Sequence, residues 1–291
     1  MSQSQPSRAS ASYQRPAVAS LKRLFRSGSG LTGLLITLLV TLCAVFAPLI
    51  SPYDPIELKP ADRLQGPSSE HWLGTDQYGR DTFSRILYGG RSSLAVAVTS
   101  IAFAAFLGTA LGLFSGYYRG WIDIVVMRLS DILLSFPAVL LAIALLAFLG
   151  NSFSNLVLAI GLVYVGPFAR VARAAVLAVR EELYVEASRA SGSSDWRTLF
   201  ITLLPNALAP LIIEVTLRLA YAILTEASLS FLGLGTPPPA PSWGQMIAEN
   251  RRFLALAPWA TVAPGLAIMV IVLGFNLLGD GLRDALDPRL K

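Results

Sequence analysis

Long apolar stretches dominate this sequence and restrict what it can fold into. The first, LTGLLITLLVTLCAVFAPLI (31–50), has about the 20 residues that one helix needs to cross a bilayer. Only 14% of the residues are charged, whereas soluble domains carry about 25%. The sequence therefore predicts an all-α integral membrane protein, a polytopic bundle of membrane-spanning helices.

About six spans are predicted, separated by segments rich in polar residues, glycine or proline. They cover residues 31–50, 93–118, roughly 126–149, 154–172, 207–234 and 260–279. In the second span, Gly108, Gly112 and Gly116 recur every four residues, a spacing that allows helices to pack closely. The packing partner lies either in the same chain, which we favour, or across a dimer interface.

Lysine and arginine outside the spans indicate the orientation, because cytoplasmic loops are enriched in both. Six spans put both termini on one side. The segments on that side hold 15 Lys and Arg, against 7 on the other side. We therefore expect both termini in the cytoplasm. The predicted organisation is a disordered cytoplasmic tail (1–28) and a transmembrane domain (29–291) with periplasmic loops at 51–91 and 235–259, a polar cytoplasmic segment at 181–206 and a cytoplasmic tail at 280–291.

Several functions are excluded by residues that the sequence lacks. One cysteine (Cys43) and one histidine (His71) cannot form a disulfide framework or a Cys/His metal cluster. No phosphate-binding Gly-x-x-x-x-Gly-Lys-Ser/Thr run occurs, and no His-Glu-x-x-His run occurs. The net charge of +5 fits cytoplasmic loops facing membrane lipids rather than a nucleic-acid surface. We therefore expect a chain without catalysis or a cofactor of its own.

One polar island, EELYVEASRASGSSDWRTLFITLLPN (181–206), interrupts the apolar second half of the chain. Gly192 suits a helix end that needs a left-handed backbone, and Ser193, Ser194 and Asp195 can cap the next helix. We predict two short helices joined by an elbow. The apolar side chains Leu183, Tyr184 and Trp196 then need a partner, either another protein or the lipid surface.

Charged residues inside spans are costly, so each marks a candidate site. Glu214 and Arg218 are four residues apart and can pair on one helix face. Glu226 either lines a transport path or forms a hydrogen bond within the bundle, and we favour the second. At the start of the third span, Arg128 and Asp131 are predicted to form a local ion pair.

Two features of the predicted outside loops are less specific. TDQYGRDTFSR (75–85) mixes acidic and basic residues, which predicts a self-satisfied amphipathic helix, or a brace for a neighbouring subunit or an outside binding protein. Trp243 and Trp259 are predicted to lie in the aromatic belt at the membrane interface. Alternatively, Trp243 shapes a docking surface for an outside partner.

The polar island resembles the EAA loop of ABC importer permeases. That loop reads Glu-Ala-Ala, three residues, Gly and then an apolar stretch ending in Leu-Pro. Here it is Glu186-Ala187-Ser188, Gly192 and Leu204-Pro205, with Ser in place of the second Ala. Three longer segments also resemble the dipeptide/oligopeptide/nickel permease family, and its C-type subunit in particular: HWLGTDQYGRDTFSRILYGGRSSL (71–94), LTEASLSFLGLGTPPPAPSWGQMI (224–247) and FNLLGDGLRDALDPRLK (275–291).

The resemblance covers the chain from about residue 30 onward and implies the type I ABC importer permease fold in a bacterial inner membrane. It implies that the loop is a coupling helix that docks on a cytoplasmic ATPase. Its matching residues are Glu186, Ala187, Ser188, Arg189, Gly192, Leu204 and Pro205. Glu186 would either contact the ATPase or hold the loop through Arg189.

The implied partners are two ATPase subunits that bind ATP and Mg, a homologous B-type permease, and a periplasmic or lipid-anchored solute-binding protein. The implied cargo is a di- or oligopeptide, or alternatively nickel, glutathione or another small solute. A self-contained channel or secondary transporter is the competing class. Few ionisable residues lie at mid-membrane, mainly Glu214, Arg218 and Glu226, which argues against a proton-coupled carrier.

Overall fold

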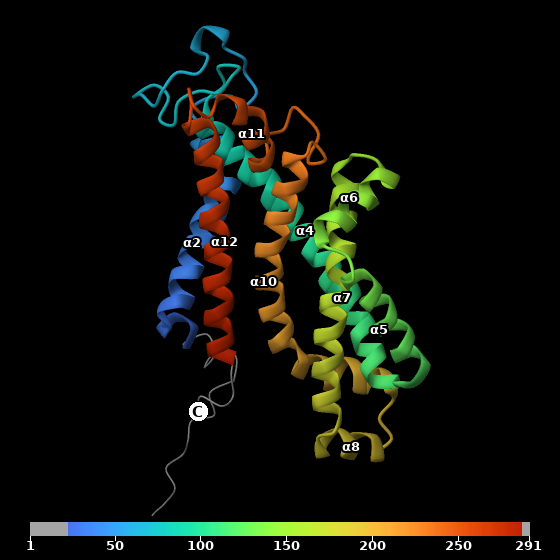
Figure 1. Ribbon diagram of the computed structural model, residues 1–291. Helices are drawn as coiled ribbons and strands as arrows, with labels where there is room; N and C mark the ends of the chain where they lie inside the picture. The colour runs from blue at the N-terminus through green and yellow to red at the C-terminus, as the bar shows by residue number, and fades with distance from the viewer. Residues whose placement is uncertain (1–22, 287–291) are drawn as a thin grey trace, which may run out of the picture.

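The computed structural model describes residues 23–286, which form a slanted bundle of helices (Figure 1). The helices are α2 (Gly28–Val45), α3 (Ala47–Ile50), η1 (Pro60–Asp62), α4 (Thr82–Tyr118), α5 (Gly120–Leu134), α6 (Ala138–Leu149), α7 (Phe153–Arg180), α8 (Leu183–Ala190), α9 (Asp195–Arg197), η2 (Thr198–Leu203), α10 (Leu204–Phe231), α11 (Trp243–Asn250), η3 (Arg251–Phe253) and α12 (Trp259–Leu286). Among the described residues the only β pairing is one isolated bridge, Thr75 to Asp81. The predicted all-α fold is confirmed.

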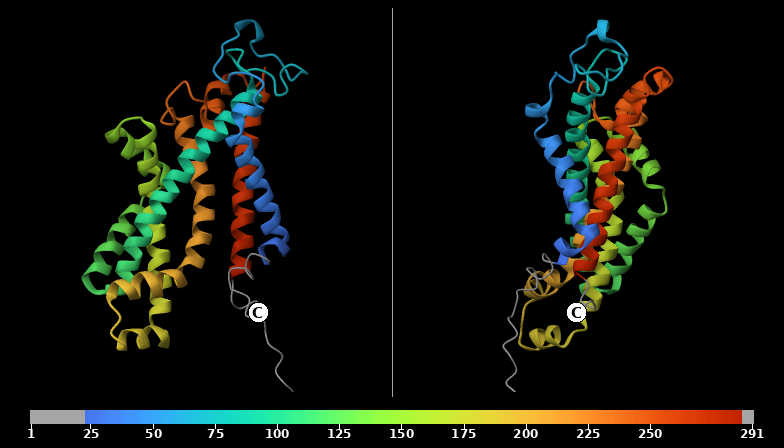
Figure 2. Two further views of the ribbon diagram at one scale, coloured as in Figure 1. Left: turned by 180° about the vertical axis from the view of Figure 1, so that it is seen from behind. Right: turned by 90° about the vertical axis from the view of Figure 1, so that its left-hand side faces the viewer.

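Five continuous helical segments are long and apolar enough to cross a membrane. They are α2, α4, α7, α12 and the run from α9 through α10, and the bent pair α5 and α6 makes a sixth span if it is counted as one. We call the two ends of the bundle the α8 end and the α11 end. α2 begins and α12 ends at the α8 end, so residues 28 and 286 lie on the same side (Figures 1 and 2). The predicted tail at 1–28 and the last residues of the tail at 280–291 lie largely outside the described residues.

The third predicted span is not one straight helix. α5 and α6 meet at a bend of 96° across residues 135–137. Pro137 has an extended backbone (φ −56°, ψ 133°) and lacks the N–H that would continue the helix. A residue before proline also disfavours the helical conformation, so Phe136 helps to end α5. The span predicted over roughly 126–149 is therefore a bent pair of helices.

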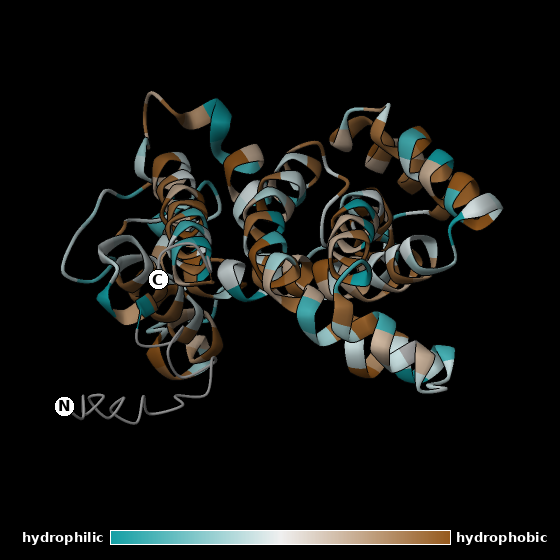
Figure 3. Ribbon diagram, turned by 90° about the horizontal axis from the view of Figure 1, so that it is seen from below, coloured by the Kyte–Doolittle hydropathy of each residue, from teal (hydrophilic) through white to brown (hydrophobic). Residues whose placement is uncertain are grey.

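Seen from the α8 end, apolar positions lie on the outward faces of the helices as well as between them (Figure 3). Phe106 and Phe148 are examples, with 80% and 91% of their surface exposed. Outward apolar surface of this kind suits a bundle surrounded by lipid, where there is no advantage in hiding it.

α4 and α7 form the most extensive helix pair in the bundle. Built on Gly108, a Cβ would lie 2.5 Å from the Cβ of Phe168, and built on Gly112 it would lie 2.6 Å from the Cβ of Ala172. The small residues therefore let the α7 backbone approach α4 directly. The prediction that these glycines serve packing within one chain is confirmed.

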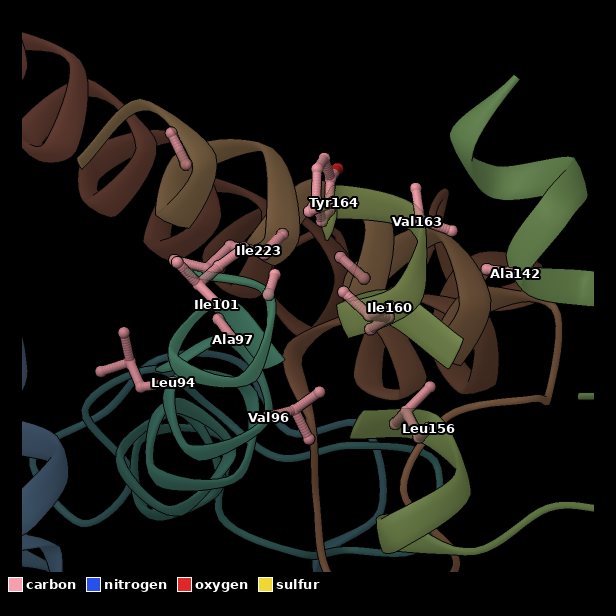
Figure 4. Close-up of a cluster of buried hydrophobic side chains, with 14 of the residues drawn as sticks. Leu94, Val96, Ala97, Ile101, Ala142, Leu156, Ile160, Val163, Tyr164 and Ile223 are labelled. Carbon is pink, nitrogen blue, oxygen red and sulfur yellow. The ribbon is translucent and has the colours of Figure 1, made fainter. Parts of the chain in front are cut away.

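The main core fills the space between α4, α6, α7 and α10 (Figure 4). Side chains from α4, such as Ile101, meet Ile160 of α7 and Ile223 of α10, all with 1% exposure or less. Because this core joins the early and late spans, the two halves of the chain form one packed body.

α4 begins eleven residues before the predicted second span, so the loop predicted over 51–91 ends at Asp81. The Asp81 carboxylate accepts a hydrogen bond from the Ser84 backbone N–H at 2.7 Å and caps the helix. It also lies 2.9 Å from Nδ1 of His71, which is buried. His71 is therefore a structural residue of the α11 end.

The charged residues at the start of α4 form a network between elements rather than a self-satisfied helix. Arg80 contacts Asp76 at 2.6 Å and Glu249 of α11 at 2.6 Å. Arg85 is 1% exposed and contacts the same Glu249 oxygen at 3.2 Å. The predicted self-satisfied amphipathic helix over 75–85 was wrong, because the helix begins only at Thr82. Besides the local Asp76, Arg80 and Arg85 share Glu249, which is 169 and 164 residues away in the sequence, where short spacings cannot reveal it.

The two tryptophans predicted for the membrane belt instead hold the α11 end together. Trp243 is 1% exposed, and its indole N–H donates to the Ile86 carbonyl at 2.9 Å. The Trp259 indole N–H donates to the Thr75 carbonyl at 3.0 Å. Each therefore ties a late helix to the loop or helix of the first half, and Trp243 has almost no surface left for docking.

Candidate functional site

The polar island forms a compact unit at the α8 end, between the end of α7 and the start of α10 (Figure 1). α8 is eight residues long, and a four-residue turn connects it to α9. The predicted elbow and the first short helix are confirmed, but the second helix is not a separate short one, because α9 continues through η2 into α10. This arrangement puts α8 at the extreme end of the bundle, beyond the ends of α2 and α12 (Figure 2).

Gly192 makes the elbow. Its φ is +82°, a left-handed conformation that glycine adopts without steric cost. A Cβ there would meet nothing within 4 Å, so the backbone angle and not crowding requires glycine. Ser194 then caps α9 through its side-chain oxygen and the Arg197 backbone N–H, 3.4 Å apart. Both predictions for the elbow are confirmed.

A small second core anchors the unit to the bundle. Its buried members come from α4, α7, α8 and η2, and they are Leu113, Tyr117, Val176, Val185, Leu199 and Leu203. The Tyr117 hydroxyl donates to the Asp195 carboxylate at 2.6 Å. α8 and α9 are therefore held against the ends of α4 and α7, and a force on α8 passes to both helices.

The outer face of this unit carries apolar side chains that nothing in the described chain covers. Leu183 is 80% exposed and Trp196 is 67% exposed, and Tyr184, which follows Leu183, is also exposed. We call these three residues the docking surface. Partial burial raises the pKa of the Tyr184 hydroxyl above its ordinary value, and the negative charge of nearby Glu182 raises it further. The side chain is therefore uncharged at neutral pH. The Trp196 ring leans on Phe200 with centroids 4.1 Å apart, which fixes its direction.

The residues matching the EAA loop lie on α8, at the elbow and at the start of α10. Glu186, Ala187 and Pro205 are exposed, Ser188 and Leu204 are half-buried, and the side chain of Arg189 is outside the described part of the chain. Ser188 donates to the Ser193 hydroxyl at 3.0 Å, closing the elbow. The two possible roles of Glu186 therefore stay predictions.

The helical turn η2 at the start of α10 was not predicted from the sequence. η2 is a π-helix, in which the Leu204 backbone N–H bonds to the Leu199 carbonyl five residues back. It stands immediately before Pro205, whose ring lacks an N–H and crowds the carbonyl four residues earlier. A wider turn accommodates that crowding, and π turns are often found at functional sites. Proline at the helix start was the only signal available.

Inside the bundle, two of the three intramembrane candidates pair as predicted. Arg218 Nε donates to Glu214 Oε1 at 2.6 Å, and the guanidinium also lies 5.9 Å from the Tyr164 ring centroid. Glu226 has no exposed surface and accepts a hydrogen bond from Ser230 at 2.7 Å. Its carboxylate lies between helices rather than on an open face, which supports the favoured structural role.

The predicted local pair of Arg128 and Asp131 does not form. Asp131 pairs instead with Arg170 of α7 at 2.5 Å. Next to it, Asp123 accepts two bonds from Arg173, at 2.5 and 2.6 Å. α5 is therefore clamped to α7 by two ion pairs that bridge sequence separations of 39 and 50 residues.

Metal-binding geometry is not found in residues 23–286, where no group of three or more His, Cys, Asp or Glu side chains could hold an ion. The expectation that the chain has no cofactor stays a prediction.

Comparison with known proteins identifies the family. Residues 108–291 match the family described as binding-protein-dependent transport system inner membrane component, and residues 17–67 match the N-terminal TM domain of oligopeptide transport permease C. The chain is 48% identical over 270 residues to the dipeptide transport system permease protein DppC of Alkalihalophilus pseudofirmus, covering 93% of this chain and 89% of the relative. It is 45% identical over 271 residues to the glutathione transport system permease protein GsiD of Pectobacterium atrosepticum, covering 93% and 90%.

The fold has a solved counterpart. A chain of the MetNI methionine ABC transporter, solved in inward facing conformations, aligns with a TM-score of 0.57 at 19% identity and covers 70% of this chain and 97% of that chain. This likeness shows the shared fold. Since the family match spans more than half of the sequence, and relatives above 40% identity align along nearly all of it, the chain belongs to the inner membrane components of binding-protein-dependent transport systems, as a C-type ABC importer permease.

Proposed function

We propose that this chain forms half of the translocation pathway of an ATP-driven importer of di- or oligopeptides, without catalysis of its own. Relatives named for dipeptide and di/tripeptide transport support the peptide class. Relatives named for glutathione transport support a second candidate cargo, which is itself a small peptide-like molecule. The partners proposed are a B-type permease, two ATPases that bind ATP and Mg, and a solute-binding protein on the outside.

The observation that carries this proposal is the docking surface on α8 and α9. Tryptophan and tyrosine are typical anchors of protein interfaces, and both are exposed here as Trp196 and Tyr184. Here they project from a unit that the second core and the Tyr117–Asp195 bond fix to α4 and α7. A docked ATPase that moved α8 would therefore tilt these helices, because a packed unit moves as one body.

We propose that the α8 end faces the cytoplasm and the α11 end faces the periplasm. Positive charge supports this orientation, since segments on the α8 side hold about twice as many Lys and Arg residues as those on the other side. Both termini would then be cytoplasmic, and the chain would be a multi-pass protein of the inner membrane. The surface around α11 would receive the solute-binding protein.

The test compares two tryptophans with matched surroundings at opposite ends of the bundle. Trp196 is 67% exposed with Phe200 at 4.1 Å, and Trp72 is 60% exposed with Phe83 at 5.0 Å between ring centroids. We expect Trp196→Ala to reduce co-purified ATPase and ATP-driven dipeptide uptake at least about tenfold, the effect of a truncated interface anchor. Trp72→Ala should leave ATPase binding unchanged. Equal ATPase recovery in both variants would contradict the proposal.

A further inference from the structure

A charged cleft lies between α5 and α7, away from the docking surface. Its volume is about 620 Å³, and it is lined by Asp123, Ile124, Met127, Arg128, Asp131, Arg170 and Arg173. Five of these seven side chains are ionisable. No other helix pair in the described part of the chain shows a comparable group of charges inside a candidate span.

The charges lie on two helices that are candidate spans, in the parts of those helices nearest the α8 end. Arg128 is eight residues from the start of α5 and Arg170 is ten residues from the end of α7, which corresponds to roughly 12 and 15 Å along the helix axes. Both helix ends are at the α8 end (Figure 1). The side chains of Arg170 and Asp131 are 50% and 48% exposed. α7 has 28 residues and is longer than the roughly 30 Å thickness of the hydrocarbon core, so these charges lie near its border on the α8 side. Half-exposed charges at that position are disfavoured against lipid, so this face of α5 and α7 borders water or another polar surface.

The ion pairs leave the cleft with an excess positive charge. Arg173 is matched by Asp123, and Arg170 is matched by Asp131. Within residues 23–286, no carboxylate lies within ion-pairing distance of Arg128, which is exposed at the cleft wall. A guanidinium is a planar fork of donors that fits a carboxylate with two parallel hydrogen bonds. The cleft is therefore suited to an anionic group and above all to a carboxylate.

We propose that this cleft lines the water-filled part of the translocation path that opens at the α8 end, and that Arg128 binds the carboxylate of the passing solute. This rests on the proposed function, because a peptide carries a terminal carboxylate whatever its side chains are. A single arginine therefore recognises the whole class without selecting a sequence. The flanking ion pairs hold α5 against α7 and keep the cleft polar without neutralising Arg128.

The first experiment asks whether the cleft holds water. The assembled importer, with Cys43→Ser to remove the only cysteine of this chain, is placed in inside-out membrane vesicles. Ile124→Cys and Val125→Cys are then treated with thiol reagents that cannot cross the membrane. The two positions are neighbours on α5 and are 63% and 47% exposed, but only Ile124 lines the cleft. We expect labelling of Ile124→Cys at least about tenfold faster than that of Val125→Cys, and equal or reversed rates would overturn the proposal.

The second experiment asks whether Arg128 attracts anions. Residue 124 is one helical turn from Arg128, with Cβ atoms about 6 Å apart. A unit positive charge at that distance in water raises the labelling rate with a sulfonate reagent and lowers the rate with a trimethylammonium reagent. The ratio of the two rates should change by about five- to tenfold. The preference of Ile124→Cys for the sulfonate reagent should disappear with Arg128→Gln and persist with Arg128→Lys. A preference unaffected by Arg128→Gln would refute the role of Arg128.

The third experiment identifies the ligand group. Millimolar dialanine should slow labelling of Ile124→Cys, whereas dialanine amide at the same concentration should not. Equal protection by both compounds, or by neither, would contradict carboxylate binding. ATP-driven release of a dipeptide enclosed with the solute-binding protein in the vesicle lumen is measured in the same vesicles, and ATPase co-purification is measured after they are dissolved in detergent. If they persist while the labelling results are negative, this inference fails alone, and if they are lost in the wild type, the proposed function fails.

Discussion

Close contact between α4 and α7 predicts that one added methyl group at Gly112 destabilises the bundle. A Cβ at this position would lie against the carbonyl oxygen of Ala169, 2.6 Å from the Cβ of Ala172 and 2.9 Å from the backbone nitrogen of Arg173. Ordinary contacts of this kind need about 3.5 Å, so the two helices must separate by roughly 1 Å. Overpacking of a tight interface costs about 1–3 kcal/mol, and here backbone rather than a flexible side chain must move.

The assay is the free energy of unfolding of the full-length chain in mild detergent, with Gly265→Ala as the control. Gly265 lies in α12, and a Cβ there would meet nothing within 4 Å. The same substitution should be neutral or stabilise by up to about 1 kcal/mol, because alanine favours a helix more than glycine does. We expect Gly112→Ala to lower the free energy of unfolding by about 1–3 kcal/mol. The reasoning is refuted if Gly112→Ala is as stable as the wild type.

Three further predictions concern the elbow, the α11 end and the anchor of α8. Gly192→Ala should weaken the coupling between ATP hydrolysis and uptake, because a left-handed backbone costs a residue with a Cβ about 1–2 kcal/mol. Gly192→Asn should have a milder effect. Equal uptake per ATP hydrolysed in the two variants would contradict this prediction. Glu249→Gln should lower stability by roughly 2 kcal/mol, since it weakens charge-assisted bonds from Arg80 and the buried Arg85, and thermal unfolding at the α11 end would report the loss. Tyr117→Phe should speed amide hydrogen exchange in α8 and α9, because Asp195 loses a bond of 2.6 Å, whereas unchanged exchange would show that the second core alone anchors them.

Local patterns were sufficient to predict the elements that depend on neighbouring residues. The elbow at Gly192 follows from one glycine and the polar residues after it, and the Glu214–Arg218 pair follows from a spacing of four on one helix. The glycine spacing in α4 likewise predicted a packing face. In each case the physical cause lies within a few residues, so the sequence displays it directly.

Contacts between distant segments could not be predicted in the same way. Asp131 pairs with Arg170 instead of the nearby Arg128, because α7 brings a better placed guanidinium to it. Trp243 is buried against α4, where its indole donates to the Ile86 carbonyl, a contact that no pattern around the tryptophan indicates. The break between α5 and α6 is a different case. Pro137 was visible in the sequence, but its effect on the continuity of the helix was not considered.

Purification of the tagged, full-length chain from its own membranes in gentle detergent tests the coupling function of the α8 end. Mass spectrometry and the mass of the intact assembly are read from the same sample. We predict one copy of this chain with a second permease and two ATPases, and loss of the ATPases when Leu183 and Trp196 are both replaced by alanine. Recovery of the wild-type chain alone at every detergent concentration would contradict the account, because the docking surface would then face lipid or a partner other than an ATPase.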